Sequence, residues 1–433
     1  MRRTTPVAPA LAMLLVVYLA TTAFAAAGDL DTTFDGDGEL VTDFTAGDDL
    51  AAAIAIQVDG KIIVAGTTSQ RFALARYEAD GTLDTTFGGD GQVTTSFVRG
   101  RQLINAVAIQ PDGRIVAVGV LRRTGQDARW ALLRYNSDGS LDTSFSGDGK
   151  VIADVADGDD YLEDVTLQVN GKIVVAGGAG GAGGRFAVAR YNENGTPDPT
   201  FSGDGKVLTN LNTGFDYATA VAIQEDTNII AGGWSGPATS PDYRFAAVRY
   251  NANGTLDGTF SGDGKVTTNF TEGNDYAWDM ALQPDGDIVL AGAAGGAGGR
   301  FAVARYDITG ALDTDFGGDG KVTTNLAAGS DVATSVTVLG DGKVLAGGWS
   351  GPVTIVPWFG PAASDDFRFA VARYDPTGIL DPTFGVNGTV TTNFTRGSDH
   401  AWDMGVQEDG KIILVGRAGG SGGRFASARY LAA

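Results

Sequence analysis

The sequence contains no cysteine and only one histidine, His400. Without cysteine the chain cannot form disulfide bonds, supply a thiol nucleophile or carry a lipid anchor on a cysteine. A nucleophilic system built on histidine would have to rely on this one residue, so the sequence gives it little support. Long amphipathic helices are also missing, because no stretch after residue 27 shows a sustained helical period with caps at its ends.

Basic residues are scarce relative to acidic ones. After residue 27 the chain has 29 basic and 52 acidic residues, a net charge of −23, because the other two basic residues are Arg2 and Arg3. A protein with this balance repels phosphate backbones and anionic membranes. We therefore expect no nucleic acid among its partners.

The first 27 residues differ from the rest. Two arginines precede the apolar run LAMLLVVYLATTAFA, and small residues follow at Ala23, Ala25 and Ala27. This pattern is typical of a secretory signal peptide, and the run is short for a transmembrane helix. We expect residues 1–27 to be a signal peptide and residues 28–433 to be one domain. The mature protein would then be secreted, extracellular or periplasmic, with no membrane insertion after signal removal.

The rest of the chain repeats itself seven times, and most repeats are 53 to 59 residues long. The segment R-aromatic-A-x-x-R-Y begins at Arg71, Arg129, Arg185, Arg244, Arg300, Arg368 and Arg424. The segment D-x-x-F ends at Phe34, Phe87, Phe145, Phe201, Phe260, Phe316 and Phe384. A period of this length accommodates four short strands and their loops.

The third repeat shows these strands clearly. Residues 161–168, IVVAGG, residues 185–191 and residues 206–211 are strands A to D. Asn-Gly or Asp-Gly recurs in the A–B and C–D turns, which is the strongest short-range signal for a hairpin. The sequence therefore predicts an all-β fold, a seven-bladed β-propeller with four-stranded antiparallel blades.

The first repeat is incomplete. Residues 28–44 contain only the D segment, and the last repeat ends at Tyr430, directly after strand C. We expect residues 28–44 to supply the outer strand of the last blade, which would close the ring and cover two sheet edges. An open β-solenoid is the alternative architecture, and it would not need such ends.

Features present in every repeat are expected to support the scaffold. An arginine near the end of strand C lies eight residues before an aspartate, so a buried pair is expected in each blade. The pairs are Arg76–Asp84, Arg134–Asp142, Arg190–Asp198, Arg249–Asp257, Arg305–Asp313, Arg373–Asp381 and, across the closure, Arg429–Asp31.

Gly-Asp-Gly loops also recur, for example at residues 147–149, 203–205 and 262–264. Acidic, glycine-rich loops can hold calcium through oxygen ligands. Each loop offers few carboxylates, however, and turn formation is the simpler interpretation. We expect no cofactor, with calcium as the open alternative.

The B–C loops are where the repeats disagree. Repeats three, five and seven carry glycine runs, whereas repeats four and six carry GGWSGPATSPDYR (232–244) and GGWSGPVTIVPWFGPAASDDFR (347–368). This alternation indicates duplication of a two-blade unit. Aromatic residues in such loops suggest a contact surface, and the candidates are Trp234, Trp349 and Trp358.

Strand A varies in the same way. Six repeats carry an aspartate at the beginning of strand A, and repeats three, five and seven continue as DYLED, DYAWD and DHAWD. We expect these side chains to gather at one mouth of a central channel. The candidate ligand-binding residues are Asp160, Glu163, Asp164, Asp275, Trp278, Asp279, Asp399, His400, Trp402 and Asp403. In the alternative interpretation the aspartates cap strand starts and the tryptophans wedge between blades.

Several functions fit this cluster. Carboxylates beside tryptophans suit a binding or interaction module for a carbohydrate, peptide or protein ligand, acting as a monomer. The main alternative is a carbohydrate-active hydrolase or lyase that uses paired carboxylates. A purely structural surface protein is a further alternative. An enzyme is less expected than a binding module, and no catalytic residue is assigned.

The repeats resemble a known family. The segments LDxTFxxDGKVTTNF, AVxxQxDGKIxVAGG and RFAVARYNxxG are similar to the delta-60 repeat of β-propellers in secreted and cell-surface bacterial proteins, over residues 28–430. The resemblance implies an exported bacterial propeller and brings no agreed activity or catalytic residues. Strands A to C also look like NHL-type propellers, which mostly bind partners. Departures are TPDPTF at residues 196–201 and Gln102 in place of the strand A aspartate.

Overall fold

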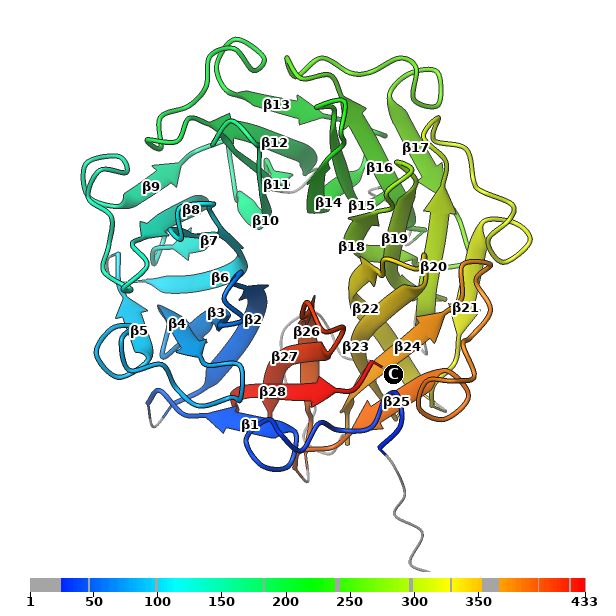
Figure 1. Ribbon diagram of the computed structural model, residues 1–433. Helices are drawn as coiled ribbons and strands as arrows, with labels where there is room; N and C mark the ends of the chain where they lie inside the picture. Colours follow the sequence, from blue (N-terminus) through cyan, green and yellow to red (C-terminus); the bar gives the residue numbers. More distant parts are fainter. Residues whose placement is uncertain are drawn as a thin grey trace, which may run out of the picture.

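The computed structural model describes residues 25–432 apart from residues 46, 98–99, 182–183, 238–241, 296–298, 328, 353–365, 396 and 420–421. Within these ranges 28 strands form seven four-stranded sheets around a central axis (Figure 1). Neighbouring strands in each sheet are antiparallel, as in the third blade. The chain is therefore a seven-bladed β-propeller, as the repeats predict. None of the described residues belongs to a helix that could span a membrane.

Each blade is built from strands A to D, with strand A innermost. The A strands are β2 (Asp49–Ile56), β6 (Arg101–Ile109), β10 (Tyr161–Leu167), β14 (Phe215–Ile223), β18 (Tyr276–Leu282), β22 (Gly329–Val338) and β26 (His400–Val406). The B strands are β3 (Ile62–Thr68), β7 (Ile115–Arg122), β11 (Ile173–Ala179), β15 (Ile229–Gly236), β19 (Ile288–Ala294), β23 (Val344–Pro352) and β27 (Ile412–Ala418).

The two outer strands complete each blade. The C strands are β4 (Arg71–Tyr77), β8 (Ala128–Tyr135), β12 (Arg185–Tyr191), β16 (Arg244–Tyr250), β20 (Arg300–Tyr306), β24 (Arg368–Tyr374) and β28 (Arg424–Tyr430). The D strands are β5 (Gln92–Thr95), β9 (Lys150–Ala153), β13 (Lys206–Thr209), β17 (Lys265–Thr268), β21 (Lys321–Thr324), β25 (Thr389–Thr392) and β1 (Glu39–Thr42).

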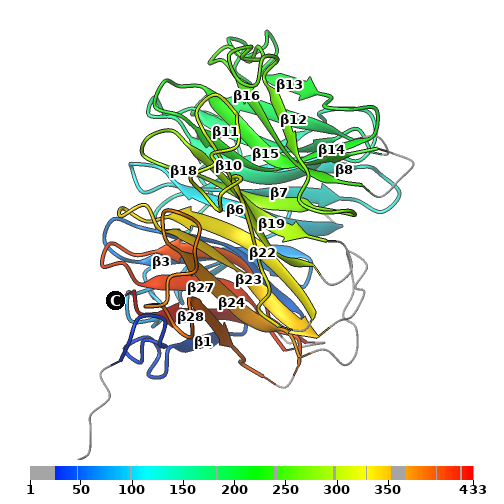
Figure 2. The ribbon, with the colours of Figure 1, turned by 90° about the vertical axis from the view of Figure 1, so that its right-hand side faces the viewer.

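The ring closes as predicted. The last sheet has the strand order β1-β28-β27-β26, so the first strand of the chain is the outer strand of the last blade. It pairs antiparallel with β28 from Glu39↔Ala428 to Thr42↔Phe425, and Leu30 forms a bridge with Tyr430. The two strands lie side by side in both ribbon views (Figures 1 and 2).

The apolar core lies between adjacent blades, in seven clusters. Both faces of strands B and C are covered by neighbouring blades, which explains why their sequences are continuously apolar rather than alternating. The phenylalanine of every D-x-x-F segment is at most 1% exposed. These contacts hold the inner strands in place.

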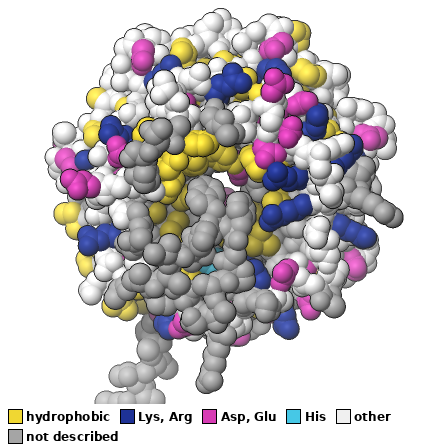
Figure 3. Space-filling view, turned by 180° about the vertical axis from the view of Figure 1, so that it is seen from behind, with side chains coloured by type: hydrophobic (Ala, Val, Ile, Leu, Met, Phe, Trp, Pro, Cys, Tyr) yellow, Lys and Arg dark blue, Asp and Glu magenta, His cyan; other side chains and the backbone are white. Residues whose placement is uncertain are grey.

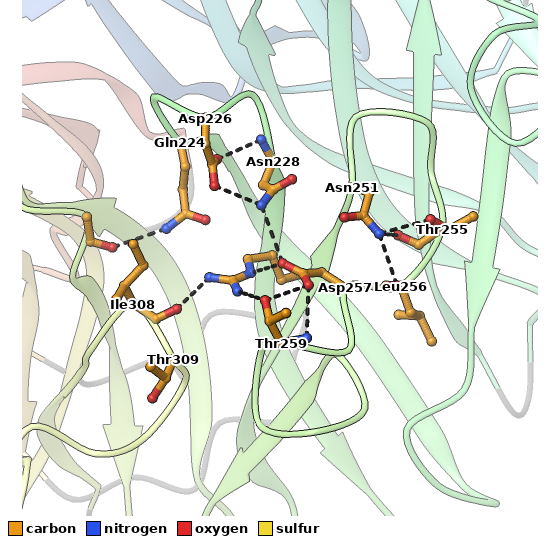
Figure 4. A network of polar contacts seen from close by, with 12 residues as sticks. Gln224, Asp226, Asn228, Asn251, Thr255, Leu256, Asp257, Thr259, Ile308 and Thr309 are labelled. Carbon is orange, nitrogen blue, oxygen red and sulfur yellow. Dashed lines mark hydrogen bonds and ion pairs between the residues drawn. The ribbon is translucent and has the colours of Figure 1, made fainter.

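All seven predicted Arg–Asp pairs form, with N–O distances of 2.6 to 3.0 Å. In the fourth blade Arg249 Nε donates to Asp257 at 2.7 Å, and Arg249 also donates to Thr259 and to the carbonyl oxygen of Ile308 in the next blade (Figure 4). The guanidinium lies 4.9 Å from the centre of the Phe260 ring. Each pair thus links two blades through partners that satisfy a buried charge.

The Gly-Asp-Gly loops form turns. In one of them Asp263 Oδ1 accepts the N–H of Lys265 at 3.0 Å, between Gly262 and Gly264, whose φ angles are 89° and 85°. Glycine is favoured at such angles because other residues are strained there. In the part of the chain that the structure describes, no group of three or more His, Cys, Asp or Glu side chains is placed to hold a metal ion.

Candidate functional site

The first aspartate of each predicted trio lies inside the protein. Asp160, Asp275 and Asp399 are fully buried. Asp160 Oδ2 accepts the N–H of Val155 at 2.7 Å and its Oδ1 accepts the N–H of Gly180 at 3.1 Å, so it ties the D–A loop to the B–C loop. Burial raises the pKa of all three. Their contacts fit the interpretation in which aspartates cap strand starts.

A contact of the same kind, made by Asp216, ends strand D of the third blade early. The sequence predicts that strand D of the third repeat reaches residue 211, but β13 ends at Thr209. The backbone N–H of Leu211 donates to Asp216 Oδ2 at 2.8 Å, which removes it from the sheet ladder. The aspartates at the starts of the A strands therefore help to fix the loops on the variable face.

Every A strand contains a β-bulge near its beginning, which the repeats did not lead us to predict. The register shifts by one residue, for example between Ala277 and Asp279, so that Trp278 is the extra residue. A glycine of strand B lies opposite each bulge. A Cβ atom on Gly292 would lie 1.8 Å from the carbonyl oxygen of Tyr276, so only glycine fits there. A bulge of this kind redirects a side chain.

The seven bulged residues form a ring around the axis, which we call the bulge ring. In chain order they are Ala52, Asn105, Glu163, Thr219, Trp278, Thr334 and Trp402. Trp402 is 40% exposed, and Glu163 and Trp278 are partly exposed. Three of the predicted site residues thus occupy equivalent positions in the third, fifth and seventh blades.

The residue after the bulge is an aspartate in these three blades. Asp164 Oδ2 accepts the N–H of Val221 in the next blade at 2.7 Å. Asp279 and Asp403 do the same with Val336 at 2.7 Å and with Ile54 at 2.9 Å, so Asp403 links the last blade to the first. Because they follow the bulge ring by one residue, these carboxylates lie farther from the variable face than the ring.

The carboxylates near the axis prefer the protonated form. Burial raises the pKa of Asp164 and of Glu163 to about 7, and burial with the charge of Asp403 raises the pKa of Asp279 to about 8. Burial also raises the pKa of Asp403. The described structure contains no ion pair between these four carboxylates and an arginine or lysine. They therefore form a region of uncompensated acidic groups.

We expect the protein to lose stability as the pH rises from 5 to 8. An aspartate in the unfolded chain ionises near pH 4, whereas Asp164 and Asp279 hold their protons to about pH 7 and 8. Folding therefore binds protons in this range, and the stabilisation from the protonated groups disappears as the pH increases through their folded pKa values. Melting temperatures across this range should fall by at least about 2 °C, and by less in Asp279→Asn.

Two groups of carboxylates affect the stability in different pH ranges, because the pKa is raised in one group and lowered in the other. Burial opposes ionisation of Asp31 and Asp381, but hydrogen bonds and their arginine partners hold both pKa values down to about 2. Their contribution is lost only below about pH 4. An unchanged slope in Asp279→Asn would show that Asp279 is not responsible for the loss between pH 5 and 8.

Two aromatic clusters lie at the start of the A strands. The first joins the fourth and fifth blades, where Trp234 contacts Tyr243, Tyr276 and Tyr217, and Tyr276 contacts Trp278. The second joins the sixth and seventh blades and contains Trp349, Phe367, His400 and Trp402. Each cluster ends on a tryptophan of the bulge ring. In Figure 3 hydrophobic side chains line a central hollow on this face.

Glu163 takes the place of a tryptophan in the third blade. It accepts hydrogen bonds from the Tyr217 hydroxyl and from Asn105 Nδ2, the latter at 2.9 Å. Burial, followed by the charge of Glu163, raises the pKa of Tyr217 well above its usual value. This arrangement holds the Glu163 carboxyl group in a fixed position beside an aromatic ring.

The structure thus places the predicted site residues in three different environments: at the mouth of the ring, near its axis and in the protein interior. It brings Glu163, Trp278, His400 and Trp402 to the mouth of the ring, with Trp234 and Trp349 behind them as buried or partly buried supports. It places the second aspartates near the axis and buries the first ones. Trp358 lies outside the described residues.

Sequence reasoning missed Asn105, Tyr217, Tyr243, Tyr276 and Phe367. Asn105, Tyr243 and Phe367 come from the preceding blade, whereas the prediction considered strand A and the B–C loop of each repeat separately. A signal was present, because strand B carries a glycine opposite the bulge in all seven repeats, at Gly66, Gly119, Gly177, Gly233, Gly292, Gly348 and Gly416.

Comparison with known proteins supports the fold. Five segments, residues 57–87, 110–145, 168–201, 224–260 and 283–316, match a family model described as "Domain of unknown function (DUF5122) beta-propeller". No curated protein matches the sequence.

Solved structures show the same architecture. Virginiamycin B lyase from Staphylococcus aureus matches with a TM-score of 0.52 and 11% identity, over 91% of this chain and 98% of that one. A catalytically inactive form of that enzyme with quinupristin matches with a TM-score of 0.52 and 11% identity, over 91% and 99%. A puromycin hydrolase has a TM-score of 0.47 and 12% identity, over 91% and 52%. At 11% identity the two virginiamycin B lyase structures show a shared fold only. This chain is therefore a β-propeller protein with repeats similar to those of the DUF5122 family.

Proposed function

We propose that the protein is an exported binding module that captures a carbohydrate at the mouth of its ring. The observation that carries this proposal is the exposed indole of Trp402, supported from behind by His400 and Trp349. A rigid aromatic face offers apolar contact area with little loss of side-chain entropy on binding. Sugar rings have flat apolar faces with hydroxyl groups at their edges, which suits aromatic rings beside carboxyl groups.

A calorimetric melt of residues 28–433 against a panel of polysaccharides, with and without calcium, tests the proposal. We expect the melting temperature to rise with at least one polysaccharide, because a ligand of the folded state stabilises it. Trp402→Ala should weaken the binding of that polysaccharide about tenfold or more, as expected for an aromatic anchor. Isothermal titration would measure this change.

Val169→Ala is the matched control. Val169 is a fully exposed apolar residue in an A–B turn, on the opposite face from the ring mouth. The control should bind like the unchanged protein. Equal losses in the two variants, or no thermal shift with any polysaccharide, would contradict a carbohydrate site at the mouth.

A second candidate function is a carbohydrate-active hydrolase or lyase. It is favoured by Glu163, whose pKa of about 7 makes both its protonated and its ionised forms available at neutral pH. Incubating the protein with the same polysaccharides and analysing the products distinguishes the two functions, because an enzyme would release shortened sugars. Such release should disappear in Glu163→Gln, whereas simple binding gives no release in either protein.

A further inference from the structure

Four rings of the first aromatic cluster correspond one by one to the four rings of the second, whereas Tyr217 of the first is replaced by Val332. These rings are Trp234, Tyr243, Tyr276 and Trp278 in the first cluster, and Trp349, Phe367, His400 and Trp402 in the second. Their members occupy corresponding positions in the fourth and fifth and in the sixth and seventh blades. The structure thus contains two copies of one aromatic unit, two blades apart.

The ring geometry repeats as well. The central tryptophan meets the next ring edge-on in both clusters, with centroids 5.0 Å apart for Trp234–Tyr243 and 4.9 Å for Trp349–Phe367. The outer contacts also agree, at 6.1 Å for Tyr276–Trp278 and 6.2 Å for His400–Trp402. The two clusters therefore have the same arrangement of rings, although Phe367 stands in place of Tyr243 and His400 in place of Tyr276.

Exposure increases along each cluster toward the bulge ring. Trp234 is 8% exposed and Phe367 is 1% exposed, whereas Trp402 is 40% exposed and Trp278 is partly exposed. The inner rings are part of the packed structure and fix the outer indole. The outer indole is the part of each cluster that can contact a ligand.

The corresponding positions at a third junction between blades do not form an aromatic cluster. At the junction of the second and third blades, the corresponding residues are Val120, Ala128, Tyr161 and Glu163. Among the described residues the mouth therefore offers two aromatic platforms rather than three. Glu163 and Asn105 make the third position polar.

We propose that Trp278 and Trp402 form paired subsites, and that two sugar rings of a single neutral glycan chain occupy them together. This inference rests on the proposed carbohydrate-binding function. Two equivalent platforms on one face match a ligand made of repeating units. The aspartate that follows each indole, Asp279 or Asp403, and the related Asp164 have no ion pair with a basic residue in the described structure. A polyanionic glycan would be repelled by the net charge of −23 that the chain carries after residue 27, which favours a neutral chain.

Paired subsites have a measurable consequence. Once a chain is long enough to reach both platforms, binding at the second becomes intramolecular, and the affinity exceeds that of one subsite by about 100-fold or more. A shorter chain fills one subsite at a time. Affinity should therefore increase stepwise with chain length.

The test uses neutral oligosaccharides of two to eight units from four series: β-1,4-glucose, α-1,4-glucose, β-1,4-xylose and β-1,4-N-acetylglucosamine. Isothermal titration with residues 28–433 should show a step in affinity of about 100-fold within one series. Trp278→Ala and Trp402→Ala should each abolish the step and leave the affinity of a short chain. The double variant should lose binding of both short and long chains.

Other results would overturn the inference. A long oligosaccharide that binds no better than its dimer, or whose affinity is unchanged in either single variant, would show that the two indoles do not act together, while leaving a carbohydrate site in place. No binding by any of the four series would contradict both this inference and the neutral-glycan form of the proposed function. Thermal melts and the variants Trp278→Phe and Trp402→Phe control for folding, because they keep an aromatic ring at each position.

Discussion

Deletion of residues 28–44 is expected to leave a chain that no longer folds cooperatively. The deletion removes the strand that pairs with β28, the buried ring of Phe34 and the carboxylate of Asp31, which lies 2.8 Å from Arg429. Loss of a buried phenylalanine side chain costs about 3–5 kcal/mol, and an unpaired buried arginine costs about 3–5 kcal/mol. Together these losses are comparable with the entire stability of a typical domain, about 5–15 kcal/mol.

A circular permutant provides the matched control. Joining Ala433 directly to Gly28 places Asp31 eight residues after Arg429, the same spacing as Arg190 and Asp198 within the third blade. Gly28 has a φ of 89°, close to the 85° of Gly195 in that turn. A permutant that begins at residue 46 and ends at residue 45 should therefore keep the fold.

Circular dichroism and urea denaturation of the two proteins would decide the matter. We expect the permutant to unfold in one transition near that of the unchanged protein, and the deleted chain to aggregate or to lack a transition. A deleted chain that still unfolds cooperatively would mean that the ring does not depend on its closing strand.

The architecture could be predicted because its signals are local and repeated. The Asp-Gly and Asn-Gly turns, the eight-residue spacing from Arg to Asp and the incomplete first repeat all describe neighbouring parts of the chain. Each of these features has one simple structural solution, and seven copies remove the ambiguity of any single one. The seven ion pairs and the closing strand followed from this reasoning alone.

The site was harder to predict because it depends on a shift of one residue. Asp160 and Asp164 belong to one short motif, yet the first is buried in a loop contact and the second lies near the axis. The bulge at Glu163 separates their environments, and Gly177 of the next strand leaves room for it, because a Cβ atom there would lie 2.0 Å from the carbonyl oxygen of Tyr161. Period-two alternation in strand A cannot show such a shift.

The aromatic supports were missed for a related reason. Trp278 and Trp402 stand out in the sequence, but the rings behind them belong to the preceding blade. Tyr243 directly precedes Arg244, and Phe367 directly precedes Arg368, so both look like loop residues in the sequence. The packing of one blade against the next places Tyr243 against Tyr276 and Phe367 against His400, the rings that contact the two tryptophans.

The second large effect is expected for the buried ion pair of the fourth blade. Asp257→Ala should lower the free energy of unfolding by about 3–5 kcal/mol, because it leaves the guanidinium of Arg249, only 4% exposed, without its counter-charge. The control is Asp242→Ala, which breaks the exposed pair with Arg244 and should cost no more than about 1 kcal/mol. Urea denaturation measures both, and equal losses would contradict the explanation.

The same substitution at the closure should be more damaging still. Within the fourth blade a short segment of chain connects Arg249 to Asp257, so the two residues stay close even when the pair is weakened. Arg429 and Asp31 lie at opposite ends of the domain and are held together only by non-covalent contacts of the last blade. Asp31→Ala should therefore destabilise the protein more than Asp257→Ala does. Because both pairs are buried and have similar N–O distances, 2.7 Å and 2.8 Å, the difference between the two variants would measure how much the ring depends on its closing strand.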